Sequence, residues 1–101
     1  MQLTNYRTSA SGDTGVSFPK LESWNRLTKV VTIAAEVNKK RVLCRIPLEI
    51  LISKFGDSDS KDEPMRSVAL HRTAIQDAAR KLIEGDVYEE DGSVLIRARD
   101  L

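Results

Sequence analysis

The sequence contains one cysteine and one histidine, the two side chains whose types could support covalent chemistry. The thiol of Cys44 and the imidazole of His71 could form a nucleophile–base pair if the fold brought them together. Cys44 alternates with Val42 and Ile46, however, which predicts a small buried side chain whose thiol pKa is raised by apolar surroundings. No glycine-rich segment that could form an oxyanion hole accompanies the pair. A structural role is favoured for both residues, and a cysteine-dependent enzyme ranks third among the functions considered.

A metal site is not expected from this sequence. One cysteine and one histidine cannot complete the tetrahedral ligand set of a structural zinc ion. The acidic segment "DSDSKDE", residues 57–63, has neither the central glycine nor the terminal bidentate glutamate of a calcium loop. We therefore interpret it as a solvated linker, and we expect no cofactor.

Basic side chains form the best candidate for a binding segment. Residues 26–45 carry six basic side chains and one acidic side chain, a net charge of +5, whereas acidic residues gather in 57–63 and 84–91. The residues that could contact a nucleic acid or a partner are Lys39, Lys40, Arg41 and Arg45. No aromatic residue alternates with these charges, so no base-stacking platform is visible. Nucleic-acid binding through residues 38–45 is therefore the second hypothesis, behind an ordinary solvated turn.

Two alternating runs must position these basic residues. In residues 31–37 and 41–46 apolar and polar side chains alternate, and the polar "NKK" between them predicts an antiparallel hairpin. Residues 16–18 are expected to form a short edge strand, and "LESW", residues 21–24, a helical turn or a loop. Asp91-Gly92 is a hairpin-turn signal, and the alternation over residues 94–98 predicts a last strand.

Helical periods occupy the rest of the chain. Residues 47–55 have the spacing of a short amphipathic helix that Gly56 ends, and residues 64–84 that of one long helix. The loop between them is much longer than the turn of a helix-turn-helix, so that motif is not expected. Leu70 falls on the polar side of the long helix and could mark a partner contact. The predicted fold class is α+β, with a small antiparallel sheet (hairpin plus C-terminal strand) packed on one face by a short and a long helix.

Arg72 lies beside the apolar stripe of the long helix, so its stem should pack against the sheet while its guanidinium finds a partner. The expected partners are strand-end carbonyl groups or the acids of the C-terminal segment, namely Glu89, Glu90, Asp91 and Asp100. We expect Arg72, like Cys44, to have a structural role and not a ligand-binding one.

The stretches "VLCRIPLEIL", "VALHRTAIQDAARKLI" and "DGSVLIRARDL" together resemble the bacterial family called domain of unknown function 1488. Its Cys-Arg-hydrophobic strand end falls on Cys44, Arg45 and Ile46, and its helix pattern on Val68, Arg72 and Ile75. The resemblance covers about residues 16–101. It implies a small α+β domain without an established activity, and it supplies no active site.

Length and composition limit the function classes. A chain of 101 residues is one domain, expected here as a flexible tail over residues 1–15 and a single α+β domain over 16–101. With 16 basic and 15 acidic residues, no global field points to a nucleic acid. No signal peptide or membrane helix is apparent, so we expect a cytoplasmic protein without a membrane partner. The favoured function is a non-enzymatic interaction or accessory module, a monomer or weak homodimer that binds an unknown protein partner.

Overall fold

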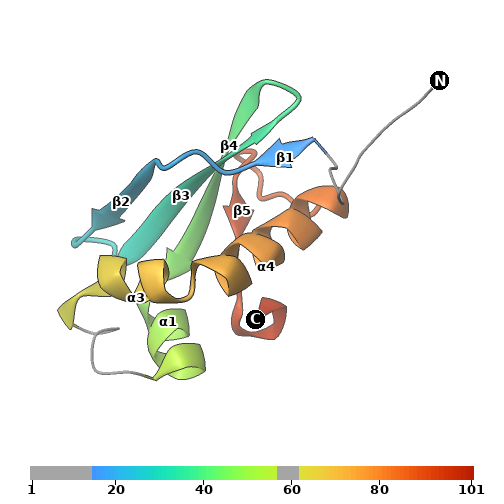
Figure 1. The fold of residues 1–101 in the computed structure, drawn as a ribbon. Coiled ribbons are helices and arrows are strands. Elements are labelled where there is room, and N and C mark those ends of the chain that lie inside the picture. Colours follow the sequence, from blue (N-terminus) through green and yellow to red (C-terminus); the bar gives the residue numbers. More distant parts are fainter. Residues whose placement is uncertain (1–14, 57–61) are drawn as a thin grey trace.

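In the computed structural model, which describes residues 15–56 and 62–101, five strands form one mixed sheet and the helices cover one of its faces (Figure 1). The α+β fold class predicted from the sequence is confirmed. The predicted flexible tail, residues 1–15, lies outside the described residues apart from Gly15, and so does most of the acidic segment 57–63.

The predicted hairpin is confirmed as the centre of the sheet. Strand β3 (Val30–Val37) pairs antiparallel with β4 (Lys40–Pro47) along its whole length. The two turn residues, Asn38 and Lys39, both have positive φ angles, 51° and 69°. Two consecutive left-handed residues give a tight turn whose twist matches that of the strands, and asparagine tolerates this conformation well.

Two short strands extend the other edge of β3. Strand β1 (Val16–Ser17) pairs with the end of β3, and β2 (Glu22–Asn25) with its beginning, both antiparallel. The expectation of a helical turn or loop over residues 21–24 was therefore wrong. The four residues of β2 alternate between half-buried and exposed positions. Pairing with β3 supplies the backbone hydrogen bonds that a short polar segment cannot form alone.

The predicted long helix is divided into two. Helix α1 (Leu48–Phe55) ends at Gly56 in the left-handed region, as expected, but residues 64–84 form α3 (Pro64–Leu70) and α4 (Arg72–Glu84). At the junction His71 has φ −112° and ψ 24°, outside helical geometry. Its ring stacks on Phe55 of α1, with centroids 3.9 Å apart and an interplanar angle of 2°. This contact holds the kink against α1, and an uninterrupted helical period in the sequence does not reveal it.

The last strand corrects the predicted antiparallel sheet. Strand β5 (Val94–Leu95) pairs with β4 in parallel, because the chain leaves β4 through α1 and returns through α3 and α4, and a helical crossover of this kind joins parallel strands. The Asp91-Gly92 turn is present, closed by a 2.7 Å hydrogen bond from Glu89 N to Ser93 O, but residues 86–90 form no strand. The predicted hairpin at this position was therefore wrong. After β5, residues Ala98–Asp100 form a 3-10 helix.

The hydrophobic core lies between the sheet and the helices. Val31 and Ile33 of β3, Cys44 and Ile46 of β4, and Val94 of β5 point to this covered face. From the helices it receives Leu51, Val68, Ile75, Ala78, Ala79 and Ile83. Full burial of a large aliphatic side chain stabilises a fold by about 1.5–3 kcal/mol, so this face provides most of the hydrophobic stabilisation.

Candidate functional site

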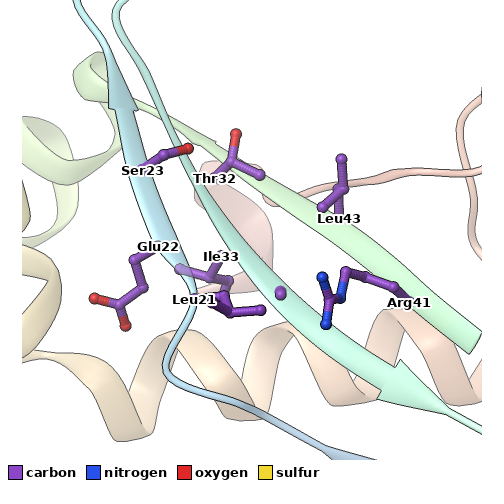
Figure 2. Close-up of a pocket in the computed structure, with 8 residues that line it drawn as sticks. Leu21, Glu22, Ser23, Thr32, Ile33, Arg41 and Leu43 are labelled. Carbon is purple, nitrogen blue, oxygen red and sulfur yellow. The ribbon is translucent and has the colours of Figure 1, made fainter. Parts of the chain in front are cut away.

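The face of the sheet opposite the helices is the candidate site, and we call it the open face. Because side chains alternate along a strand, the residues between the core positions point to this side. The register places them next to one another, with Thr32 opposite Ser23 and Arg45, and Ala34 opposite Leu43. Figure 2 shows Ser23, Thr32 and Leu43 on one side of the sheet, while the carboxylate of Glu22 points away from them. None of the helices that the structure describes covers this face.

Two exposed leucines give the open face an apolar centre. Leu21 is 47% exposed and Leu43 is 42% exposed, and both line one shallow hollow together with Ser23, Thr32, Ala34 and Arg41. Ala34 is buried on this side, and its backbone N–H donates to the carbonyl oxygen of Leu21 at 3.0 Å. The hollow therefore has an apolar floor and a polar rim.

The basic residues predicted as contacts are divided between two places. Arg41 and Arg45 lie on the open face, on either side of Leu43, whereas Lys39 and Lys40 lie at the hairpin turn, exposed to solvent. Arg41 pairs with Glu36 at 3.5 Å, and Arg45 pairs with Asp91 at 3.1 Å. All four side chains of these pairs are well exposed, so solvent screens the pairs and each contributes little to stability.

An acidic turn borders the open face on the β5 side. Glu89, Glu90 and Asp91 line a second hollow with Arg45, Ser93 and Leu95. The backbone N–H and the hydroxyl of Ser93 donate to Asp91 at 2.9 and 2.5 Å. Hydrogen bonds from the Ser93 side chain and backbone, together with the charge of Arg45, lower the pKa of Asp91. Asp91 is therefore ionised at neutral pH, and opposite charges lie side by side on this face.

Cys44 lies on the covered face and not on the open one. Its side chain is fully buried, and desolvation raises its pKa to about 11. The thiol donates a weak hydrogen bond to the carbonyl oxygen of Val42, at 3.9 Å, while the His71 ring stacks on Phe55. At neutral pH this sulfur is a thiol and not a thiolate, so it is a poor nucleophile.

Arg72 reaches a partner that sequence reasoning missed. Its two terminal guanidinium nitrogens pair with the two carboxylate oxygens of Glu22 on β2, the second contact measuring 3.3 Å. The expected partner among the C-terminal acids was wrong, because β2 was not recognised as a strand. The segment from Leu21 to Trp24 does not alternate apolar and polar side chains, and the one sequence signal nearby is Asn25, a turn-forming residue whose side chain accepts hydrogen bonds from two backbone N–H groups.

Within residues 15–56 and 62–101 no cluster of histidine, cysteine and carboxylate side chains could hold a metal ion. In the same part of the chain, none of the helices has the length and hydrophobicity that crossing a membrane requires.

Comparisons with known proteins agree with this geometry. The sequence profile of the family described as "Protein of unknown function (DUF1488)" matches residues 16–96. The fold is similar to the crystal structure of a protein of unknown function from the same family from Shewanella loihica PV-4. That similarity has a TM-score of 0.76 at 16% sequence identity and covers 85% of this chain and 96% of the other. Among curated proteins, none matches this chain.

Proposed function

The chain belongs to the DUF1488 family, and from that premise we propose that it is a cytoplasmic, non-enzymatic module that binds a protein partner through the open face of its sheet. The family is of unknown function, so the proposal is supported by the geometry of this chain. One observation carries it: the helices cover one face of β3 and β4, while the other keeps Leu21 and Leu43 exposed beside Arg41 and Arg45.

The composition of the open face supports a protein partner. Apolar residues at the centre of a patch, with arginines beside them, are typical of protein interfaces, in which arginine is enriched. Leu43 lies within β4, and Leu21 directly precedes β2 and accepts a hydrogen bond from Ala34 N of β3, so little conformational entropy is lost when the two leucines are covered. The buried, protonated thiol of Cys44 is the reason to place an enzymatic function last.

Nucleic-acid binding through residues 38–45 is the second proposal. Lys39 and Lys40 are exposed at the hairpin turn, and they form no ion pair with the described residues. These two lysines could bind the phosphate groups of a nucleic-acid backbone. Two observations argue against nucleic-acid binding. Arg41 and Arg45 are already in ion pairs, and the acidic residues beside Arg45 would repel phosphate groups.

Affinity capture from a nuclease-treated lysate, followed by identification of the captured proteins, tests the first proposal. The variant Leu43→Glu should lose a protein that the wild-type chain captures, because a carboxylate replaces the apolar centre. Leu70→Glu is the matched control, since Leu70 is 62% exposed on α3, outside the open face. Equal capture by all three proteins would contradict the proposal. Salt-sensitive retention on heparin that is lost in the double variant Lys39→Ala and Lys40→Ala would favour nucleic acid instead.

A further inference from the structure

The open face carries both signs of charge in two adjacent rows. The first, which we call the basic strip, is Arg41 and Arg45 of β4, with Leu43 between them. The second, the acidic turn, is Glu89, Glu90 and Asp91 on the β5 side of the basic strip. Arg45 and the acidic turn line the same hollow, so the two rows are in contact. A surface with this pattern is complementary to itself, because a rotated copy would present an acidic row to each basic row.

Two apolar side chains lie among the charged ones on this part of the open face. Leu43 is partly exposed on β4, and Leu95 is half-buried on β5, directly opposite Arg45 in the parallel register. Covering these side chains would remove apolar surface from water, while the charged rows at their sides fix the orientation of the partner.

We propose that the open face binds a second copy of this chain in a two-fold dimer, an inference that rests on the proposed function of the same face. A two-fold axis parallel to the strands, between β4 and β5, places the basic strip of one copy over the acidic turn of the other. The same contacts then occur twice, as a two-fold interface requires. Leu43 and Leu95 of the two copies meet near the axis, between sheets that pack face to face.

The ion pairs within one chain permit this exchange. Arg45 and Asp91 lie 3.1 Å apart with both side chains well exposed, a type of pair that contributes little and rearranges readily. Glu90 is exposed and has no ion-pair partner in residues 15–56 and 62–101, so it is available to an arginine of another copy. The dimer therefore gains new pairs without breaking a buried one.

Charge balance also separates a second copy from other occupants. An acidic protein segment or a nucleic acid would fit the basic strip but would lie against the acidic turn. A basic segment would meet the opposite difficulty at Arg41 and Arg45. A second copy satisfies both rows together, and for this reason we commit to it.

Self-association through these contacts must depend on salt. Analytical ultracentrifugation should show a monomer–dimer equilibrium whose dissociation constant rises about tenfold between about 0.05 M and 0.5 M sodium chloride, because exposed charges are screened. Leu43→Glu should raise the dissociation constant by at least about tenfold, while Leu70→Glu leaves it unchanged. Circular dichroism confirms that the variants are folded, which is expected because all the changed residues lie at the surface.

A charge exchange between copies gives the decisive test. Arg45→Glu alone places a carboxylate at position 45 against Glu90 of the other copy, and Glu90→Arg alone places a guanidinium at position 90 against Arg45, so each variant should be monomeric. An equimolar mixture should form a heterodimer as stable as the wild-type dimer, because Glu at position 45 then faces Arg at position 90 of the other copy. A contact within one chain cannot produce rescue by mixing.

A wild-type chain that stays monomeric at every concentration would overturn the inference, and so would a mixture that fails to associate. If Leu43→Glu still loses a different captured protein, the proposed function stands and only the second copy is wrong. If the chain is monomeric and capture is also unchanged, both are wrong.

Discussion

The two faces of strands β3 and β4 are formed by alternate residues of the same two strands, and they differ in burial and in charge. On the covered face, Val31, Ile33, Cys44 and Ile46 are buried beneath the helices. On the open face, Thr32, Leu43 and Arg45 remain in contact with solvent. The covered face therefore stabilises the fold, and the open face can be changed without unfolding it. A surface that folding does not need, but that keeps leucines exposed, is where binding is expected.

The largest effect should come from the covered face. Ile46→Ala removes a fully buried side chain and leaves a cavity between β4 and the helices, which should lower the free energy of unfolding by about 2–5 kcal/mol. Urea denaturation followed by circular dichroism measures it. A loss similar to that of the open-face variant Leu43→Ala would remove the distinction between the faces.

The second largest loss of stability should follow from breaking the ion pair between Arg72 and Glu22. It joins α4 to β2, and the Glu22 side chain is only 16% exposed, so Arg72→Ala leaves a partly buried carboxylate unpaired. We expect a loss of about 1–3 kcal/mol, and only partial recovery in Arg72→Lys, since an ammonium group cannot bind both oxygens in the same planar geometry.

Arg41→Ala is the matched control for that pair, because Arg41 pairs with an exposed carboxylate, Glu36, on the open face. Its effect on the urea midpoint should be close to zero. Equal losses in Arg41→Ala and Arg72→Ala would show that burial does not set the strength of these pairs.

The buried thiol predicts a smaller effect that depends on pH. An unfolded chain releases the Cys44 proton near the ordinary thiol pKa of 9.0, whereas the folded chain holds the proton up to a pKa of about 11. The stability that depends on this group is therefore fully present below pH 9.0 and declines as the pH rises toward 11. Between neutral pH and about pH 9.5, the free energy of unfolding of the wild-type chain should fall by about 1 kcal/mol more than that of Cys44→Ala. Rapid labelling of the folded protein by iodoacetamide at neutral pH would contradict the burial that causes it.

Of the two substitutions of apolar residues by alanine, Leu43→Ala should have the smaller effect on stability. Leu43 is partly exposed already, so the free energy of unfolding should change by about 0.5 kcal/mol or less. Self-association measured by ultracentrifugation should nevertheless weaken. A variant that lost stability but kept its self-association would reverse the roles assigned to the two faces.

Local patterns predicted part of this structure and tertiary contacts decided the rest. The alternation around Cys44 and the turn at Asn38 specify the β3–β4 hairpin without help from other elements. The kink at His71 depends on the ring of Phe55 in another helix, and the direction of β5 depends on the path of the whole crossover. Neither is encoded within a short window of sequence.

The candidate site was predicted in part for the same reason. Arg41 and Arg45 were identified by charge, but Ser23 belongs to a strand that only pairing with β3 stabilises, and Leu21 directly precedes that strand. The partner of Arg72 was missed along with that strand. The open face therefore emerged only once β2, β3 and β4 were placed side by side.

Residue-resolved NMR of the isotope-labelled chain tests the central claim most directly. Amide signals are recorded while the protein concentration is raised by on the order of a hundredfold, across the range in which a weak dimer forms. We expect shifts beside the proposed axis, at Leu43, Arg45, Glu90 and Leu95, while the amides of α3 and α4 stay in place. Shifts that gather around Leu70 and the helices, with the open face unchanged, would contradict it.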